Sequence, residues 1–458
     1  MILTKKIKFA TAIFSTGILS FAGVVIETAM NITFPKLMKL FAVSLDQIQW
    51  ITTSYLLVLS AMMPLSAFLK KRFPAKKLFV TAALLFLAGV LLDAGSLNLV
   101  SLICGRILQG IGTGISLPLM FNLILEQAPP EKMGLLIGLG NFVTATAPAI
   151  GPVYGGILVD TWGWRMIFIL MIPLILAALF AGSWAIEQKT ELHAEKFDLL
   201  GWLLAALAFS FSITAFSFLA SNLPLFILFL LAAILVSFLI KHHYQQTSTP
   251  VLNWGVLKHK IFRLFLGCYF IGQFTVLGLS FLEPNLVQLF FKKTSFQAGL
   301  TMAPGALVGA IATIFGGMLL DRLGAKEPLL FGIGVQSISL LLFVCFLPKL
   351  NVLTITLVYI LFAFGQALSM PNLMTSGLQQ LESKQQADGN ALFNTFQQFA
   401  GAAGTAVVSA NVSMDKTATK FSGFSFGLIF LLGGLIIDLL FLLRAFKLST
   451  GNGNIKSK

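Results

Sequence analysis

Apolar residues dominate long stretches of this 458-residue chain, and polar residues gather in the short segments between them. A helix that crosses about 30 Å of hydrocarbon needs roughly 20 predominantly apolar residues. Fourteen stretches meet that length, which predicts an all-α membrane protein with fourteen transmembrane helices. They are 9–34, 48–69, 78–97, 100–124, 134–158, 165–186, 199–220, 223–241, 262–290, 297–319, 328–348, 351–374, 387–412 and 422–443.

The composition of the chain supports this prediction and excludes an ordinary soluble protein. Hydrophobic residues make up 57% of the sequence and charged residues only 10%, whereas soluble proteins carry roughly 25% charged residues. The net charge of +14 arises from basic residues scattered between the apolar runs, so we expect a lipid bilayer and no nucleic acid as partner. The three cysteines lie inside apolar runs without metal-ligand spacing, and we expect no metal site.

The distribution of Lys and Arg predicts how the helices are oriented. If the N-terminus is cytoplasmic, 22 of the 31 basic residues fall in cytoplasmic segments and 8 in outer segments, while Arg106 lies within a run. Cytoplasmic loops of membrane proteins carry the excess of Lys and Arg. We therefore expect a multi-pass protein of the cell's inner (plasma) membrane with both termini in the cytoplasm.

The longest charged connections divide the chain into three parts. They span 187–198 and 241–260, and they isolate the seventh and eighth runs, which carry no charge within the membrane. Six runs remain on either side, which predicts two six-helix bundles and an inserted helix pair with a peripheral structural role. The predicted parts are an amino-terminal bundle (1–187), a central loop with the inserted hairpin (188–260), and a carboxy-terminal bundle with a short cytoplasmic tail (261–458).

The two predicted bundles repeat each other. After the second run of each bundle comes a short basic turn, at 67–77 and at 317–326. An acidic residue also lies late in the first run of each bundle, Glu27 in one and Glu283 in the other. The occurrence of both features together indicates homologous halves.

Three charged residues fall within the apolar runs at a similar depth. At 1.5 Å per residue, Glu27, Arg106 and Glu283 lie about 12, 10 and 13 Å below the outer edge of the membrane. A charge at mid-bilayer costs at least a few kcal/mol on insertion scales, so such groups usually face a watery cavity or a partner. The similar depth allows the three side chains to share one cavity.

These charges suggest proton coupling. A carboxylate beside an arginine stays ionised, whereas a desolvated carboxylate without a partner binds a proton. We assign Glu27 as the proton carrier, Arg106 as the group that modulates its proton affinity, and Glu283 as a second carrier or a cation-binding acid. The alternative is a static buried ion pair between Glu27 and Arg106 that holds helices together.

Uncharged polar side chains within the runs are the candidates for substrate contacts. The 44 Phe and 14 Met supply an adaptable apolar lining that suits lipophilic aromatic ligands. We expect roughly half of the polar candidates to line a cavity and the others to bridge helices. The candidates are Asn31, Tyr55, Gln109, Asn141, Gln273, Gln288, Asn394, Gln397 and Gln398.

The sequence shows no pattern of catalytic chemistry. No nucleotide-binding loop, haem site or nucleophile–base pair is apparent in it. We therefore expect no enzyme and no cofactor, and transport energised by a proton gradient.

Several short motifs occur at definite places along the predicted helices. They are Glu27-Thr28…Asn31…Pro35 in the first run, Trp50 to Leu57 opening the second, Gly105-Arg106…Gly110 in the fourth, Ala147 to Gly156 in the fifth, and Gly317…Asp321-Arg322…Gly324…Lys326 after the tenth. Through these motifs the chain resembles, over essentially its whole length, the major facilitator superfamily and within it the fourteen-span drug:proton antiporters.

This resemblance implies the major-facilitator fold and a monomeric, proton-coupled multidrug efflux antiporter. Such a protein confers antibiotic resistance by exporting lipophilic, often cationic, drugs or dyes through alternating access. The resemblance also implies gating roles for Asp321 and Arg322 in their cytoplasmic turn. The motif of the fifth run is associated with exporters, and it adds Gly151, Pro152, Gly155 and Gly156 to the gating residues.

Two other functions fit the same sequence. One is an exporter of a specific endogenous solute or lipid on the same fold. The other is a non-transporting membrane sensor or scaffold, against which the matched depth of the three charges argues. For the motif residues, a solvated loop pair at 321–322 and ordinary small-residue packing at 147–156 are the alternatives.

Overall fold

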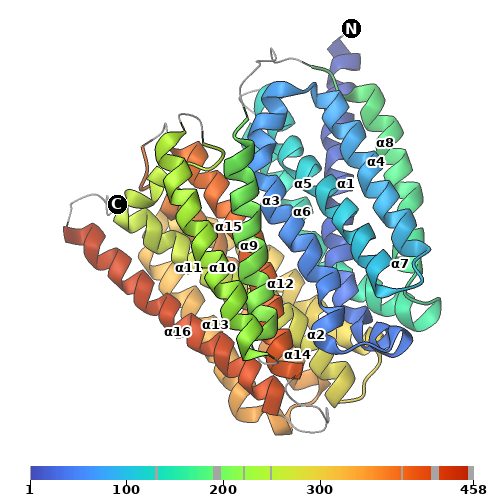
Figure 1. The fold of residues 1–458 in the computed structure, drawn as a ribbon, viewed down its shortest axis with the longest axis vertical. Coiled ribbons are helices and arrows are strands. Elements are labelled where there is room, and N and C mark those ends of the chain that lie inside the picture. Colours follow the sequence, from blue (N-terminus) through green and yellow to red (C-terminus); the bar gives the residue numbers. More distant parts are fainter. Residues whose placement is uncertain are drawn as a thin grey trace.

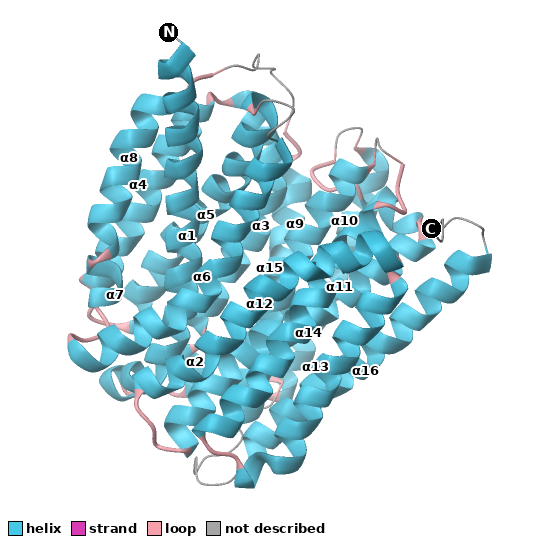
Figure 2. Ribbon diagram, turned by 180° about the vertical axis from the view of Figure 1, so that it is seen from behind, coloured by secondary structure: helices cyan, strands magenta, loops and turns pink. Residues whose placement is uncertain are grey.

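The computed structural model describes residues 2–128, 133–188, 197–219, 222–247, 250–382, 385–413 and 422–451, which form long helices joined by short segments (Figure 1). No strand occurs in this part of the chain, and helices fill the view in Figure 2. Each predicted apolar run coincides with a helix. The long helices are α1 (Ile2–Phe41), α3 (Trp50–Arg72), α4 (Ala75–Ala94), α5 (Leu99–Gln127), α6 (Met133–Thr161), α8 (Met171–Ala185), α9 (Leu199–Phe218), α10 (Leu223–Gln246), α11 (Lys260–Asn285), α12 (Ser295–Leu323), α13 (Lys326–Phe346), α14 (Val352–Leu378), α15 (Gln386–Ser413) and α16 (Ser422–Gly451).

Short helical segments adjoin some of the long helices. A π-helical segment, η3 (Leu286–Phe290), continues α11 without a break. The others are α2 (Leu45–Ile48), α7 (Met166–Ile169), η2 (Trp254–Lys258) and η4 (Leu347–Lys349).

Twelve helices in the described residues are long and apolar enough to cross a membrane. The prediction of fourteen spans is not confirmed by this criterion, because α6 and α15 are not among the twelve. Both are nevertheless long helices, of 29 and 28 residues. They also pack against helices that do qualify, α6 against α1 and α12, and α15 against α3 and α11.

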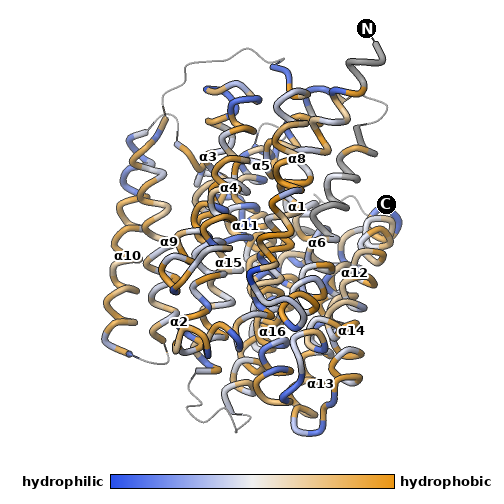
Figure 3. The backbone as a smooth tube through the Cα atoms, turned by 90° about the vertical axis from the view of Figure 1, so that its right-hand side faces the viewer, coloured by the Kyte–Doolittle hydropathy of each residue, from blue (hydrophilic) through white to orange (hydrophobic). Residues whose placement is uncertain are grey.

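The inserted pair lies between the helices that precede it and those that follow it (Figure 1). Helix α9 contacts both groups, since the indole Nε1 of Trp202 donates to the backbone oxygen of Ala61 on α3 at 2.7 Å, and the ring of Phe209 stacks on Phe399 of α15 at 4.6 Å. Helix α10 packs on α9 and exposes a largely apolar surface at the margin of the molecule (Figure 3). Of the two helices, only α10 fits the peripheral role expected for the pair.

The helices before the insertion meet those after it at one end of the molecule, where α1 ends and α12 begins. The amide of Gln288 donates to the backbone oxygen of Ile32 at 3.0 Å. The backbone N–H of Phe296 donates to Asp160 Oδ2 at 2.7 Å. The hydroxyl of Ser409 donates to the backbone oxygen of Leu45 at 3.1 Å. The predicted orientation makes this the outer end, where these contacts join the two groups of helices.

Small residues allow α6 to approach both groups of helices at this end. A Cβ atom on Gly155 would lie 2.8 Å from the backbone oxygen of Ala29 on α1, and one on Gly156 would lie 2.7 Å from that of Ser295 on α12. Such distances leave no room for a side chain. The glycines of the fifth run therefore build the junction of α1, α6 and α12.

We predict that Gly155→Ala destabilises the protein. The added methyl group collides with backbone rather than with a movable side chain, and overpacking of this kind costs about 1–3 kcal/mol. The unfolding temperature of the purified protein in detergent measures the effect. The control is Gly334→Ala on α13, where a Cβ meets nothing within 4 Å and the loss of a helical glycine is stabilising by roughly 0.5–1 kcal/mol. A Gly155→Ala protein as stable as this control would contradict the packing argument.

Candidate functional site

Arg106 is a fully buried charge among the first helices, and its contacts define the site. Its side chain, on α5, has no exposed surface. Nη1 donates to Gln109 Oε1 at 2.6 Å, and Nε donates to the backbone oxygen of Ile51 at 3.3 Å. The guanidinium lies over the ring of Tyr55 at 4.2 Å, whereas Nη2 has no hydrogen-bond partner. Residues 106 and 109 share a face of α5 because they are three positions apart.

Glu27 faces this arginine from α1 but does not bond to it. The carboxylate lies within electrostatic range of Arg106, and its side chain is only 7% exposed. No ion pair or hydrogen bond joins it to another side chain of the described residues. One turn further along α1, Asn31 accepts a hydrogen bond from Thr52 at 2.9 Å. The predicted pair is therefore brought together, but it is not a closed ion pair in this structure.

Asp93 belongs to the site and was missed by the sequence analysis. It lies on α4 without exposed surface, and its Oδ2 accepts a hydrogen bond from Gln109 Nε2 at 2.6 Å. Its Oδ1 has no hydrogen-bond partner. Asp93 stands one residue before the end of α4, a place where a carboxylate usually meets water, so its position in the sequence does not reveal its burial. The available signal was a further carboxylate inside a predicted apolar run, 78–97.

Glu283 lies apart from the arginine. Its carboxylate, on α11, is fully buried, and neither oxygen has a hydrogen-bond partner. It lies close to Thr301 of α12 and Tyr359 of α14. The hydroxyl of Thr301 donates to the backbone oxygen of Ala298 at 2.7 Å instead. The two glutamates, although predicted at a similar depth, thus lie in different helix groups and do not meet around one arginine.

The predicted substrate-contact residues separate into three sets. Tyr55 and Gln109 surround Arg106, so their first role is to hold the guanidinium. Asn31 and Gln288 bridge helices through the hydrogen bonds given above. The side chain of Asn141, on α6, lies outside the described part of the structure. The remaining candidates are on α11 and α15, where Gln273 is buried and Asn394, Gln397 and Gln398 are half-buried.

Among these last residues, two already have partners. The side-chain amide of Asn394 donates to the backbone oxygen of Asn390 at 2.9 Å. Gln397 Oε1 accepts a hydrogen bond from the Tyr269 hydroxyl at 3.0 Å.

The predicted gating residues differ in their surroundings. Asp321 and Arg322, at the end of α12, are exposed, and no ion pair links them to other described residues. Gly151 and Pro152 lie with Gly155 and Gly156 in the packed junction of α6. A further carboxylate, Asp438 on α16, is fully buried and neither oxygen has a hydrogen-bond partner, although the sequence places it near the inner interface.

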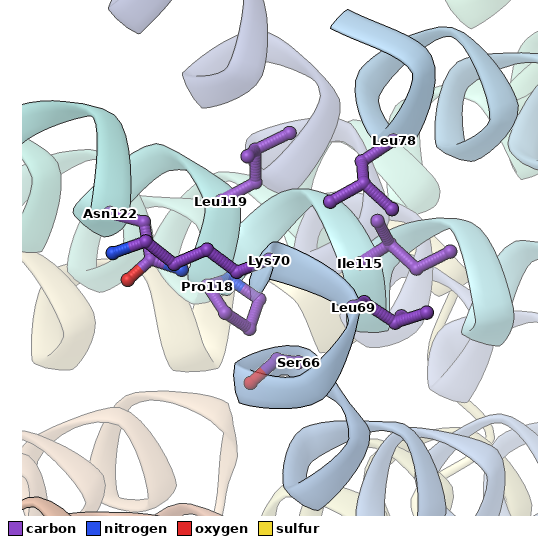
Figure 4. A pocket seen from close by; sticks show the side chains of 8 residues that line it. All are labelled: Ser66, Leu69, Lys70, Leu78, Ile115, Pro118, Leu119 and Asn122. Carbon is purple, nitrogen blue, oxygen red and sulfur yellow. The ribbon is translucent and has the colours of Figure 1, made fainter. Parts of the chain in front are cut away.

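A small pocket between α3, α4 and α5 is separate from this site (Figure 4). Its residues on α5 begin at Ile115, more than two turns beyond Arg106. Lys70 is its one charged lining residue, and the ammonium group pairs with Glu126 at 2.7 Å. The lining residues are Ser66, Leu69, Lys70, Leu78, Ile115, Pro118, Leu119 and Asn122.

The fold and the buried charges together define a polytopic membrane transporter, and comparison with known proteins gives the family. Residues 13–405 match the sequence model of the Major Facilitator Superfamily. The chain belongs to this superfamily, and it is a transporter rather than an enzyme.

Individual relatives agree with this assignment. The lincomycin resistance protein LmrB of Listeria innocua is 31% identical over 422 residues, which cover 90% of this chain and 88% of that protein. A multidrug resistance protein B homolog of Mycobacterium tuberculosis is 26% identical over 79% of this chain and 68% of its own length. The inward-facing crystal structure of a bacterial homolog of the human lysosomal transporter Spinster has the same fold. Its TM-score is 0.69 at 14% identity, covering 96% of this chain and 97% of that one.

The stacking of Arg106 on Tyr55 leads to a prediction about two variants. Tyr55→Leu removes the aromatic face beneath a desolvated guanidinium, which we expect to cost about 2 kcal/mol. Tyr55→Phe keeps that face and removes a buried hydroxyl that has no hydrogen-bond partner, so we expect no loss of stability. Thermal unfolding in detergent measures both. Equal losses in the two variants would show that the hydroxyl, and not the ring, stabilises the site.

Proposed function

We propose that the protein is a proton-coupled multidrug efflux antiporter that exports lipophilic, often cationic, compounds by alternating access. In this proposal fourteen helices cross the membrane, as bundles 1–187 and 261–458 with the inserted segment 188–260. The protein works as a monomer in the plasma membrane, with both termini in the cytoplasm. It needs no cofactor, because the proton gradient supplies the energy.

The observation that carries the proposal is the unbonded approach of Glu27 to Arg106. A permanent structural ion pair within a membrane is expected to close its hydrogen bonds, because the desolvation of both charges is otherwise uncompensated. Here the guanidinium keeps one donor, Nη2, without a partner, and the carboxylate makes no hydrogen bond to another side chain of the described residues. This arrangement suits a carboxyl group that gains and loses a proton beside a fixed positive charge.

The proposed cycle uses the two glutamates differently. Glu27 retains slight exposure and carries the proton, while Arg106 favours its release. Glu283 is sealed between α11, α12 and α14 and is the second carrier or the acid that receives a cationic substrate. Because a carboxylate without partners is costly at this depth, Glu283 holds a proton until the surrounding helices move.

The contacts at the outer end support an inward-facing state. Asp160 of α6 accepts the hydrogen bond of the Phe296 N–H at the start of α12 and pairs with Lys36 Nζ at 3.4 Å. The proposed opening to the outside breaks the contact between Asp160 and α12. Asp321 and Arg322 form the corresponding cytoplasmic latch in the other state.

The substrate class rests on the relatives and on the chemistry of the helices. One relative is named for resistance to lincomycin and another for resistance to multiple drugs. Buried acids suit cationic ligands, and the polar residues of α11 and α15 supply hydrogen bonds. The second candidate function is export of a specific endogenous solute or lipid, which the same fold and charges would serve.

We predict that Glu27→Gln abolishes transport driven by a pH gradient. In proteoliposomes with an imposed gradient, the variant should move ethidium, a lipophilic cationic dye, no faster than protein-free vesicles do, because the glutamine binds no proton. Glu327→Gln, a change of an exposed glutamate on α13, is the matched control and should transport like the unchanged protein.

Two results would contradict the proposal. Uphill, pH-dependent dye efflux by the Glu27→Gln protein would exclude Glu27 as the carrier. Wild-type vesicles that move neither ethidium nor lincomycin, yet move an endogenous solute from a cell extract against its gradient, would favour the second candidate.

We also predict that Asp160→Ala shifts the protein toward the outward-open state. The change removes the acceptor for the N–H of Phe296, the second residue of α12, a contact comparable to a helix cap and contributing about 0.5–2 kcal/mol. The ratio of outward-open to inward-open molecules should therefore rise by about 2- to 30-fold. Spin-label distances between the outer ends of α6 and α12 measure this ratio. Asp46→Ala, in the short outer helix α2, should leave the distances unchanged; an unchanged distribution for Asp160→Ala would contradict the latch.

A further inference from the structure

Three fully buried side chains form an oriented chain behind Glu27. The amide oxygen of Gln109 accepts from Arg106 at 2.6 Å, and its amide nitrogen donates to Asp93 at 2.6 Å. Only this orientation of the amide satisfies both neighbours, since an arginine has only donors and a carboxylate only acceptors. Gln109 therefore connects a buried positive charge to a buried acid.

The network leaves two buried polar atoms without hydrogen bonds. Arg106 Nη2 and Asp93 Oδ1 are both buried and have no hydrogen-bond partner. An unsatisfied buried polar atom costs about 1–3 kcal/mol, and more when it is charged. The backbone of Gly105 fits directly against the Asp93 carboxylate, in space that a side chain would occupy. The close contact of α4 with α5 thus holds an incompletely bonded acid beside the arginine.

We propose that Asp93 is a positioning residue that competes with Glu27 for the charge of Arg106, with Gln109 as the connection. This inference rests on the proposed function, in which Glu27 exchanges a proton. When Glu27 is protonated, Asp93 is the anion that balances the charge of Arg106, to which Gln109 connects it. When Glu27 releases its proton to the solvent, Arg106 turns its free Nη2 toward the new carboxylate. The interaction of Arg106 with Asp93 through Gln109 then weakens.

Among the residues that the structure describes, the charged surroundings of Arg106 contain no other candidate for this role. Glu27 faces it from α1, Tyr55 from α3 and Asp93 from α4. Of the helices packed against α1, α6 carries Asp160 at its outer end, and α11 carries Glu283 beside Tyr359. The described residues of α8 include no charged side chain. The competition is therefore between two carboxylates for one arginine.

The test uses Asp93→Asn in the full-length protein. Asparagine has the same size and still bonds to Gln109, but it removes the charge. Without the competing anion, Arg106 favours the ionised form of Glu27, so Glu27 holds its proton less tightly. We expect the pH midpoint of ethidium binding to the purified protein to move down by about one unit, a tenfold change in proton concentration. Asp93→Glu should restore the midpoint at least in part.

Gln109→Leu tests whether Asp93 acts through Gln109 or through its charge alone. This variant keeps the Asp93 carboxyl group but removes the bridge, so its midpoint should also move down. A purely structural role for Asp93 would lower the unfolding temperature and leave both midpoints unchanged, which would overturn the inference. A shift in Asp93→Asn without a shift in Gln109→Leu would overturn the connection through Gln109.

The same titration distinguishes the inference from the function on which it rests. Ethidium binding by the wild-type protein that does not depend on pH would contradict proton coupling itself. A pH-dependent wild type with an unchanged Asp93→Asn midpoint would contradict only the role of Asp93.

Discussion

The placement of one arginine inside a membrane helix constrains the rest of the amino-terminal half. A guanidinium cannot lose its charge, so burial of Arg106 requires acceptors and an aromatic face around it. Helix α3 supplies the Ile51 oxygen and the Tyr55 ring, α5 supplies Gln109, and α4 supplies Asp93 through that amide. Glu27, on α1, thus faces a positive charge that these groups of α3, α4 and α5 already stabilise. In the proposed cycle, this leaves the carboxyl group free to change its protonation without unfolding the site.

A second constraint acts at the outer end, where close packing replaces charge. The glycines of α6 bring backbone against backbone at α1 and α12, and Asp160 joins the two through hydrogen bonding. A rigid junction beside a few breakable polar contacts is suited to rocking one helix group against the other. The inserted helix α9 bridges α3 and α15 on another side, so any such motion must slide α9 along at least one of them.

The two glutamates show how similar sequence positions acquire different environments. Both lie late in the first run of their half, and the internal repeat makes them look equivalent. Glu27 faces an arginine because α5 of its own half carries one, whereas the corresponding helix α14 offers Tyr359 near Glu283. One acid is thereby placed beside a charge and the other in a neutral, sealed position. In the proposed cycle, this difference makes the proton pathway asymmetric.

The positions of the helices follow from the apolar runs alone, because a hydrocarbon-length apolar run has few alternatives in a membrane. The sequence also identified Glu27, Arg106 and Glu283, because charges stand out in such runs. Which of these charges meet depends instead on how the helices pack. Depth along a helix fixes one coordinate, but the rotation of each helix and its neighbours fix the others, so Glu283 was placed too near Arg106. Asp93 escaped notice for the same reason: a carboxylate at a helix end is exposed or buried according to the helix that packs over it, and here α5 covers it.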